Sequence, residues 1–214
     1  MTLDRALLIS IHGLGKDPFR TPSLSYSKKK QPPRKVEQRP RIFIACSHED
    51  AAKVLRIKEH LIANGFSDVS DSQPLAPSDD IKSSIDEAVG ATEVTISVVS
   101  ITSLLVTWLA QEAASSQGKR FIACYIDDDY LKLKFKDQVA DHTASKLGEI
   151  GEEVKARIDE QQRPNDLIPT MDLYRELQSK AVKIVRQLRD TGCIDLREEL
   201  FEDGLRRLLQ TLKE

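Results

Sequence analysis

The most constraining feature of this sequence is a regular alternation, between residues 41 and 126, of short apolar runs and longer segments with helical spacing. Ile42–Cys46, Val94–Val99 and Phe121–Ile126 are mainly apolar, which is typical of strands buried on both faces. A fourth strand is expected at Phe66–Val69. Strands that alternate with helices predict an α/β fold, in which helices cover both faces of a parallel sheet through right-handed crossovers.

Apolar residues at helical intervals fill the segments between these runs. The first helix is expected to end at Gly65, because glycine suits the position just past a helix end. Its apolar positions are Val54, Ile57, Leu61 and Ile62. Asp79 or Asp80 can cap a second helix, whose apolar positions are Ile81, Ile85 and Val89. A third helix is expected from about Ser103 to Gln117.

The segment 130–190 is longer than a single crossover between two strands requires. A helical insertion is therefore expected before the last strand. A charge-rich helical pattern runs from about Leu133 to Gln161, and a second amphipathic helix follows a break at Pro164–Pro169. The last strand is expected at Cys193–Leu196, with a final helix from Glu198 onward.

The N-terminal 40 residues differ in composition from the rest. Leu7–His12 can form one short strand, but clustered lysines and Pro32-Pro33 favour an extended, solvated chain. We therefore interpret residues 1–40 as an extension or linker and residues 41–214 as one domain. A strip that contacts RNA, DNA or an acidic partner is the alternative for residues 1–40, although no interleaved aromatic residues support base stacking there.

Charge and cysteine content narrow the class of protein. The net charge is -2, from 32 basic and 34 acidic residues, which argues against nucleic acid as a partner. Three cysteines, none in a C-x-x-C pair, argue against a disulfide framework and for a reducing compartment. The longest apolar run, Ala6–Ile11, is too short to span a bilayer. We expect a cytoplasmic protein with no membrane contact.

Several familiar catalytic motifs are absent from the sequence. Gly13-Leu14-Gly15 is followed by Pro18 where a dinucleotide fingerprint needs glycine, and no phosphate-binding G-x-x-x-x-G-K-[ST] loop or G-x-S-x-G elbow occurs. The four histidines lack metal-ligand spacing: His12, His48, His60 and His142. We therefore expect neither a metal site nor a bound cofactor.

Trp108 and Glu112 form the one arrangement in the sequence that suggests a catalytic site. They lie four residues apart on the predicted third helix, so they share one of its faces. In parallel α/β folds the ligand crevice lies beyond the carboxyl ends of the strands, where this helix begins. From the residues alone, a solvated Glu112 and a Trp108 that packs against the sheet are the more common roles.

Four segments resemble the bacterial form of the Toll/interleukin-1 receptor (TIR) domain. Ile42–Asp50 is similar to the family's opening "FISYS-x-x-D" strand and loop, and Asp71–Ala88 to its mobile loop and second helix. Val98–Glu112 is similar to its "S…W-x-x-x-E" segment, and Cys193–Leu208 to its closing strand and helix. The resemblance covers about half the chain and implies a flavodoxin-like parallel sheet with a helical insertion before the last strand.

The resemblance also implies an activity. Many TIR domains cleave NAD+ between nicotinamide and ribose, and release nicotinamide with ADP-ribose or a cyclic ADP-ribose isomer. The glutamate of W-x-x-x-E is their catalytic residue, which here is Glu112. NAD+ would be a substrate and not a cofactor. A role in bacterial antiviral defence would follow, by NAD+ depletion or by synthesis of a nucleotide messenger for a downstream effector.

Other site residues come from the same resemblance. Ser47 and His48 follow the first strand, where family members contact substrate, and Trp108 would form a wall of the pocket. Asp80 ends the mobile loop, whose contact with a neighbouring protomer commonly completes the active site. The resemblance therefore implies self-association through TIR–TIR contacts and a monomer of low activity.

Two other functions stay open. The first is a non-catalytic TIR module that signals by oligomerisation, which is favoured by the long insertion and by Cys46, where the family usually has tyrosine. The second is a nucleoside deoxyribosyltransferase, whose fold and glutamate chemistry are similar.

Overall fold

The computed structural model describes residues 39–72 and 80–214. Contacts divide the chain into two units, Met1–Glu37 and Gln38–Glu214, and the description below concerns the second. The predicted extension of residues 1–40 therefore lies outside the described residues except for Arg39 and Pro40. No helix in the described ranges combines the length and the apolar character that a bilayer crossing requires.

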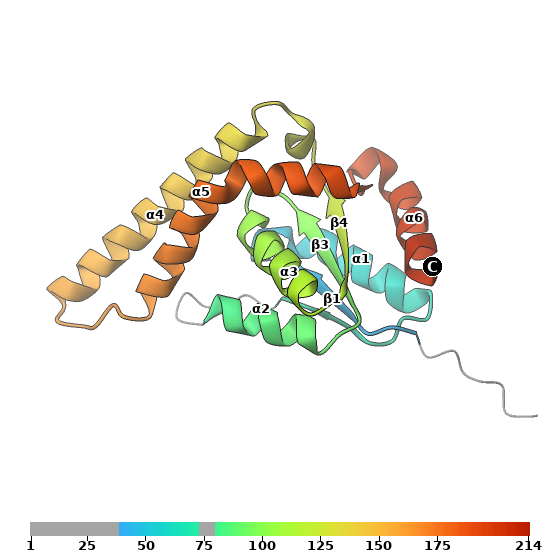
Figure 1. The fold of residues 1–214 in the computed structure, drawn as a ribbon, viewed down its shortest axis with the longest axis horizontal. Helices are drawn as coiled ribbons and strands as arrows, with labels where there is room; N and C mark the ends of the chain where they lie inside the picture. The colour runs from blue at the N-terminus through green and yellow to red at the C-terminus, as the bar shows by residue number, and fades with distance from the viewer. Residues whose placement is uncertain (1–38, 73–79) are drawn as a thin grey trace, which may run out of the picture. The chain divides into compact units, whose positions relative to one another are not determined.

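The second unit is built on a five-stranded parallel sheet with the strand order β2-β1-β3-β4-β5 (Figure 1). The strands are β1 (Ile42–Ala45), β2 (Val69–Asp71), β3 (Val94–Val99), β4 (Arg120–Tyr125) and β5 (Ile194–Asp195). This is the flavodoxin-like order, in which the chain reverses direction across the sheet between β1 and β3. The predicted α/β fold with a parallel sheet is confirmed.

Helices cover both faces of the sheet, as the apolar runs predict. On one face, α1 (Ala51–Ala63) and α6 (Phe201–Lys213) bury apolar side chains against the strands. On the other face lie α2 (Ile81–Gly90), α3 (Leu104–Ser116) and part of α5 (Leu167–Thr191). All six residues of β3 are buried, because this central strand has a helix layer on each side.

The end of α1 explains why β2 begins later than its predicted start at Phe66. Gly65 has a φ of +87°, and the backbone N–H of Phe66 donates a hydrogen bond to the Leu61 carbonyl at 3.0 Å. This helix-terminal turn uses the amide that a strand would need, so Phe66 packs into the core instead. Ile62, predicted on the apolar side of α1, is 49% exposed.

The predicted insertion consists of two long helices, α4 (Phe135–Asp159) and α5, which lie side by side as a hairpin (Figure 1). The break between them is shorter than predicted, because α5 starts at Leu167 and includes Pro169 in its first turn. Proline is tolerated there, since the N–H groups of a first turn have no helical partner. From Leu177 onward α5 packs on the sheet, so it also serves as the crossover from β4 to β5.

Gly204 is the position where α6 approaches the sheet most closely. A Cβ atom at Gly204 would overlap the Asp195 carbonyl oxygen of β5 and would lie 2.7 Å from Leu196 Cδ2. Because backbone cannot move aside as a flexible side chain can, only glycine fits this crossing.

We therefore predict that Gly204→Ala lowers the free energy of unfolding by about 1–3 kcal/mol, although alanine is the better helix former. Gly148→Ala in α4 is the matched control, because a Cβ at Gly148 meets nothing within 4 Å. The control should raise stability by up to about 1 kcal/mol. Urea unfolding of both variants measures the difference, and equal effects would contradict the predicted overlap.

Candidate functional site

A cavity of about 280 Å³ lies at the carboxyl ends of the strands. Cys46 and Ser47 follow β1, Ser72 follows β2, and Thr102 follows β3, and all four line the cavity. This is the edge where parallel α/β sheets bind ligands, because loops of neighbouring crossovers diverge there.

The cavity has two walls of different origin. The sheet edge, the 3₁₀ turn η1 (His48–Asp50) and the starts of α2 and α3 form the first: Cys46, Ser47, His48, Glu49, Ser72, Ile81, Thr102, Leu105 and Val106. The insertion forms the second, with residues of α4 and α5: His142, Lys146, Glu149, Ile150, Glu153, Thr170 and Tyr174. The insertion therefore closes one side of a pocket that the sheet edge begins.

A hydrogen-bond network fixes the loop after β1 against the loop after β3. The Ser47 hydroxyl donates to Asp50 Oδ2 at 3.0 Å, and the Ser100 hydroxyl donates to the same oxygen at 2.7 Å. Thr102 Oγ1 lies 3.0 Å from Ser47 Oγ and 3.1 Å from Ser100 Oγ. Because Asp50 accepts from both loops, the first wall of the cavity is held in position before any ligand arrives.

The cavity lining contains two of the five predicted site residues, Ser47 and His48. The other three, Glu112, Trp108 and Asp80, are not among its lining residues. The structure therefore brings together the two residues after β1. On α3, Trp108 lies less than one helical turn beyond the lining residue Val106, and Glu112 lies about two turns beyond it.

Trp108 is a core residue. It is 3% exposed and packs with the apolar side chains of α2, α3 and α5. The Lys180 ammonium lies 4.9 Å from the centroid of its ring, which is within the range of a cation–π contact. The burial of Trp108 supports a packing role, which is one of the two roles that the sequence left open.

Glu112 lies on the exposed side of α3 beside α5. Its side chain is 49% exposed, and its Oε1 lies 3.7 Å from Lys180 Nζ. Lys180 has a much closer partner in Glu176, at 2.5 Å. The hydrogen bond to Glu176 is accordingly the main cause that raises the pKa of Lys180, and Glu112 adds to it. Glu112 is thus a partly free carboxylate with one loose ion pair.

Asp80 caps α2. Its carboxylate accepts hydrogen bonds from the Ser83 N–H at 3.1 Å and from the Ser83 hydroxyl at 2.6 Å. The two bonds from Ser83 lower the pKa of this carboxyl group. The predicted cap is confirmed for Asp80, whereas Asp79 and the rest of the loop at 73–79 lie outside the described residues.

The sequence analysis missed the second wall of the cavity. His142, Lys146 and Glu149 recur at helical spacing on α4, which puts them on one face of the helix. Burial is the main cause that lowers the pKa of His142 and raises that of Tyr174. The spacing was visible in the sequence, but nothing in it showed which face of α4 meets the sheet edge.

Cys46 is a buried residue that lines the cavity. Burial raises the pKa of its thiol, so the protonated form dominates at neutral pH. Within residues 39–72 and 80–214, no group of three or more His, Cys, Asp or Glu side chains could hold a metal ion.

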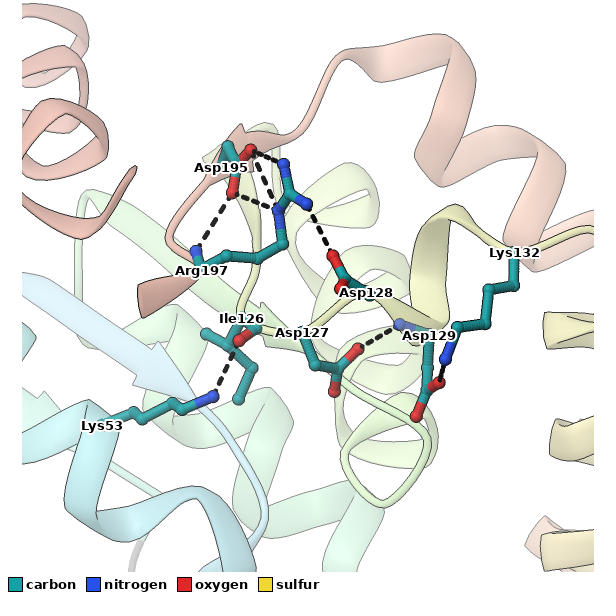
Figure 2. Close-up of polar contacts among 8 residues, drawn as sticks. All are labelled: Lys53, Ile126, Asp127, Asp128, Asp129, Lys132, Asp195 and Arg197. Atoms are coloured by element: carbon teal, nitrogen blue, oxygen red, sulfur yellow. Dashed lines mark hydrogen bonds and ion pairs between the residues drawn. The ribbon is translucent and has the colours of Figure 1, made fainter. Parts of the chain in front are cut away.

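Charged residues at the carboxyl ends of β4 and β5 pair with one another (Figure 2). The Arg197 guanidinium binds Asp195 at 2.7 Å and Asp128 at 2.5 Å. On the other side of the loop, Lys53 Nζ donates to the Ile126 carbonyl at 2.7 Å. Through Arg197, Asp128 of the acidic run after β4 is thus tied to Asp195 of the short strand β5.

This link predicts a specific sensitivity to acid. Hydrogen bonds from Arg197 are the main cause that lowers the pKa of Asp195 to about 2, below its ordinary value. A lowered pKa adds stability that is fully present above about pH 4 and is lost as the pH falls through about 2. Asp195→Asn should therefore be less stable at pH 7 and should lose less stability than wild type between pH 4 and pH 2. Thermal melting at a series of pH values would show parallel losses if this assignment is wrong.

Burial of Trp108 predicts a large effect of truncation on folding. Trp108→Ala should lower the free energy of unfolding by about 3–5 kcal/mol, because it leaves a cavity in the core. Trp108→Phe should cost less, because most of the ring volume is kept. Urea unfolding would contradict this assignment if both variants were as stable as wild type.

Residues 42–144 match a family model described as TIR domain. The matched range contains Ser47, His48, Trp108 and Glu112, and it ends within α4, so most of the insertion lies beyond it. No curated protein matches the chain.

Proposed function

The chain contains a TIR domain over residues 42–144, and from this premise we propose that it cleaves NAD+ at the bond between nicotinamide and ribose. Glu112 is the proposed catalytic carboxylate. One observation carries the proposal: Glu112 ends the W-x-x-x-E segment of the matched range, and its side chain stays half exposed with one loose partner. A carboxylate in this state is available to a substrate without unfolding any part of the core.

A single carboxylate is enough for this reaction. The ribose–nitrogen bond breaks with its electron pair going to the nicotinamide ring, which leaves as a neutral molecule and needs no acid. Positive charge develops on the ribose, and a nearby carboxylate stabilises it while accepting a hydrogen bond from a ribose hydroxyl. Water then adds to the ribose and releases a proton, giving ADP-ribose. Attack by the adenine of the same molecule would give a cyclic isomer.

The resting monomer is expected to be weakly active. Lys180 neutralises part of the Glu112 charge, and the packing of α5 covers Trp108. Self-association that draws the Lys180 side chain away from Glu112 would leave this carboxylate fully available to substrate. The ion pair costs little to break, because exposed pairs contribute about 0–1 kcal/mol. Consumption of NAD+ or production of a messenger in antiviral defence would then depend on assembly.

Loss of the Glu112 carboxylate should abolish this activity. Glu112→Gln keeps the shape of the side chain, and we expect it to lower nicotinamide release from NAD+ by at least about 100-fold. The assay uses concentrated protein with a crowding agent, and chromatography follows nicotinamide and the nucleotide product. Product identity separates hydrolysis from cyclisation.

Glu176→Gln is the matched control for this experiment. It removes the other carboxylate bound to Lys180 but lies on α5, outside the matched range. It should lower nicotinamide release far less than Glu112→Gln does, because it leaves the Glu112 carboxylate in place and only lets Lys180 pair more closely with it. Equal turnover by wild type and Glu112→Gln, or no turnover by wild type even in assembled form, would refute the proposal.

A non-catalytic TIR module is the second candidate function. The burial of Trp108 and the absence of Glu112 from the cavity lining favour it, because neither residue then needs a substrate. Light scattering that shows concentration-dependent assembly, without nicotinamide release from wild type, would support this function.

A further inference from the structure

The connection between β4 and α4 holds two leucine side chains in water. It contains the 3₁₀ turn η2 (Asp129–Leu131) and runs on through Lys134 to the start of α4. Leu131 is 50% exposed and Leu133 is 90% exposed, the largest fraction for a large apolar side chain among the described residues. We infer that this segment, Leu131–Lys134, docks the protein on the surface of an anionic lipid bilayer, and we call it the arch.

The backbone of the arch is anchored on both sides. Tyr130, just before it, is 3% exposed, and its ring packs edge-on against that of Phe135, just after it, with 5.5 Å between the ring centroids. The Arg189 guanidinium of α5 donates hydrogen bonds to the Tyr130 and Lys132 carbonyls, at 2.9 and 3.2 Å. Because these contacts fix the backbone, the two leucines cannot turn into the core without breaking them, and they stay available to a partner.

Lysines alternate with the apolar residues of this segment. Lys132, Lys134 and Lys136 are all exposed. Lys132 pairs with Asp129 at 2.5 Å, whereas no carboxylate among the described residues forms an ion pair with Lys134 or Lys136. Two ammonium groups are therefore available to lipid phosphates. Their long side chains can reach the headgroups while the leucines enter the boundary of the acyl chains.

α5 adds basic groups beside the arch. Arg189, which binds the arch carbonyls, is exposed, and Arg186 lies three residues before it on the same side of the helix. With the two free lysines this makes four basic groups, of which Asp137 and Asp190 offset two. The arch and its helical neighbours thus carry an excess of positive charge, on a chain whose net charge is -2. This excess favours an anionic surface.

The acidic run that precedes the arch is bound within the protein (Figure 2). Asp128 pairs with Arg197 and Asp129 with Lys132, both at 2.5 Å. Asp127 accepts a hydrogen bond from the Asp129 N–H at 2.9 Å, and burial is the main cause that raises the pKa of its carboxyl group. These carboxylates therefore have partners of their own and leave the free lysines of the segment unpaired.

The position of the arch favours a bilayer over a nucleic acid, which would leave the leucines in water. The arch stands beyond α5 at the top of Figure 1, so its tip can enter a phase that deforms around it. The sequence analysis expected no membrane contact because no apolar run can span a bilayer, but a contact at the surface needs no such run. One copy would bind weakly and reversibly, and assembled copies more tightly.

Sedimentation of the full chain with lipid vesicles tests the inference. Vesicles of phosphatidylcholine alone are compared with vesicles that contain equal parts of phosphatidylcholine and phosphatidylserine. Wild type should bind the anionic vesicles roughly 10- to 30-fold more tightly, because the excess positive charge meets anionic headgroups. Added salt should reduce this preference.

Replacement of the two leucines separates insertion from charge attraction. The double variant Leu131→Ala/Leu133→Ala should bind anionic vesicles at least about 10-fold more weakly than wild type, because less apolar surface leaves water. Leu55→Ala on α1 is the matched control, since Leu55 is also exposed, at 55%, but lies outside the arch, and it should change nothing. In Leu133→Trp, lipids brominated on their acyl chains should quench the fluorescence of the introduced indole. Thermal melts verify that each variant is folded.

Three results would overturn the inference. The first is no binding of wild type to anionic vesicles. The second is binding that the leucine substitutions leave unchanged, which would assign it to other lysines, such as those of residues 1–38. The third is assembly in solution that these substitutions abolish, which would assign the arch to a second copy. None of these measurements involves NAD+, so leucine-dependent binding would support the inference whether or not the chain releases nicotinamide.

Discussion

The burial of β3 on both faces is the constraint from which the rest of the structure follows. All six residues of this strand are buried, so a layer of helices must cover each side of the sheet. Parallel strands joined by helices place every carboxyl end at the same edge. The loops after β1, β2 and β3 therefore meet there, and the cavity forms between them and the insertion.

α5 has two structural roles that bear on function. Its second half covers the sheet as the crossover to β5, and the same helix carries Lys180 over Trp108 and beside Glu112. Shielding of the W-x-x-x-E segment is thus a consequence of how the chain returns to the last strand. Any partner or assembly that alters the packing of α5 would act on Glu112 directly.

The two ends of α3 face different surroundings, and this separates the cavity from Glu112. At its start, Leu105 and Val106 line the cavity with η1 and the insertion. Further along, Glu112 is half exposed and pairs loosely with Lys180. The cavity lining and Glu112 can therefore be altered independently by mutation.

The sequence by itself determined the parallel α/β fold, the cap at Asp80 and the candidate pair Trp108–Glu112, because periodicity, capping and spacing along one helix are local properties. The resemblance to the TIR family also indicated Ser47 and His48, which directly follow a recognisable strand. The predicted start of β2 at Phe66 was wrong, because the Phe66 N–H donates to the Leu61 carbonyl in the turn that ends α1. Only the tertiary structure decided that Tyr174 and Lys146 line the cavity while Glu112 does not. Which faces of α4 and α5 meet the sheet depends on packing between segments far apart in the chain, and a pattern within one helix does not contain that information.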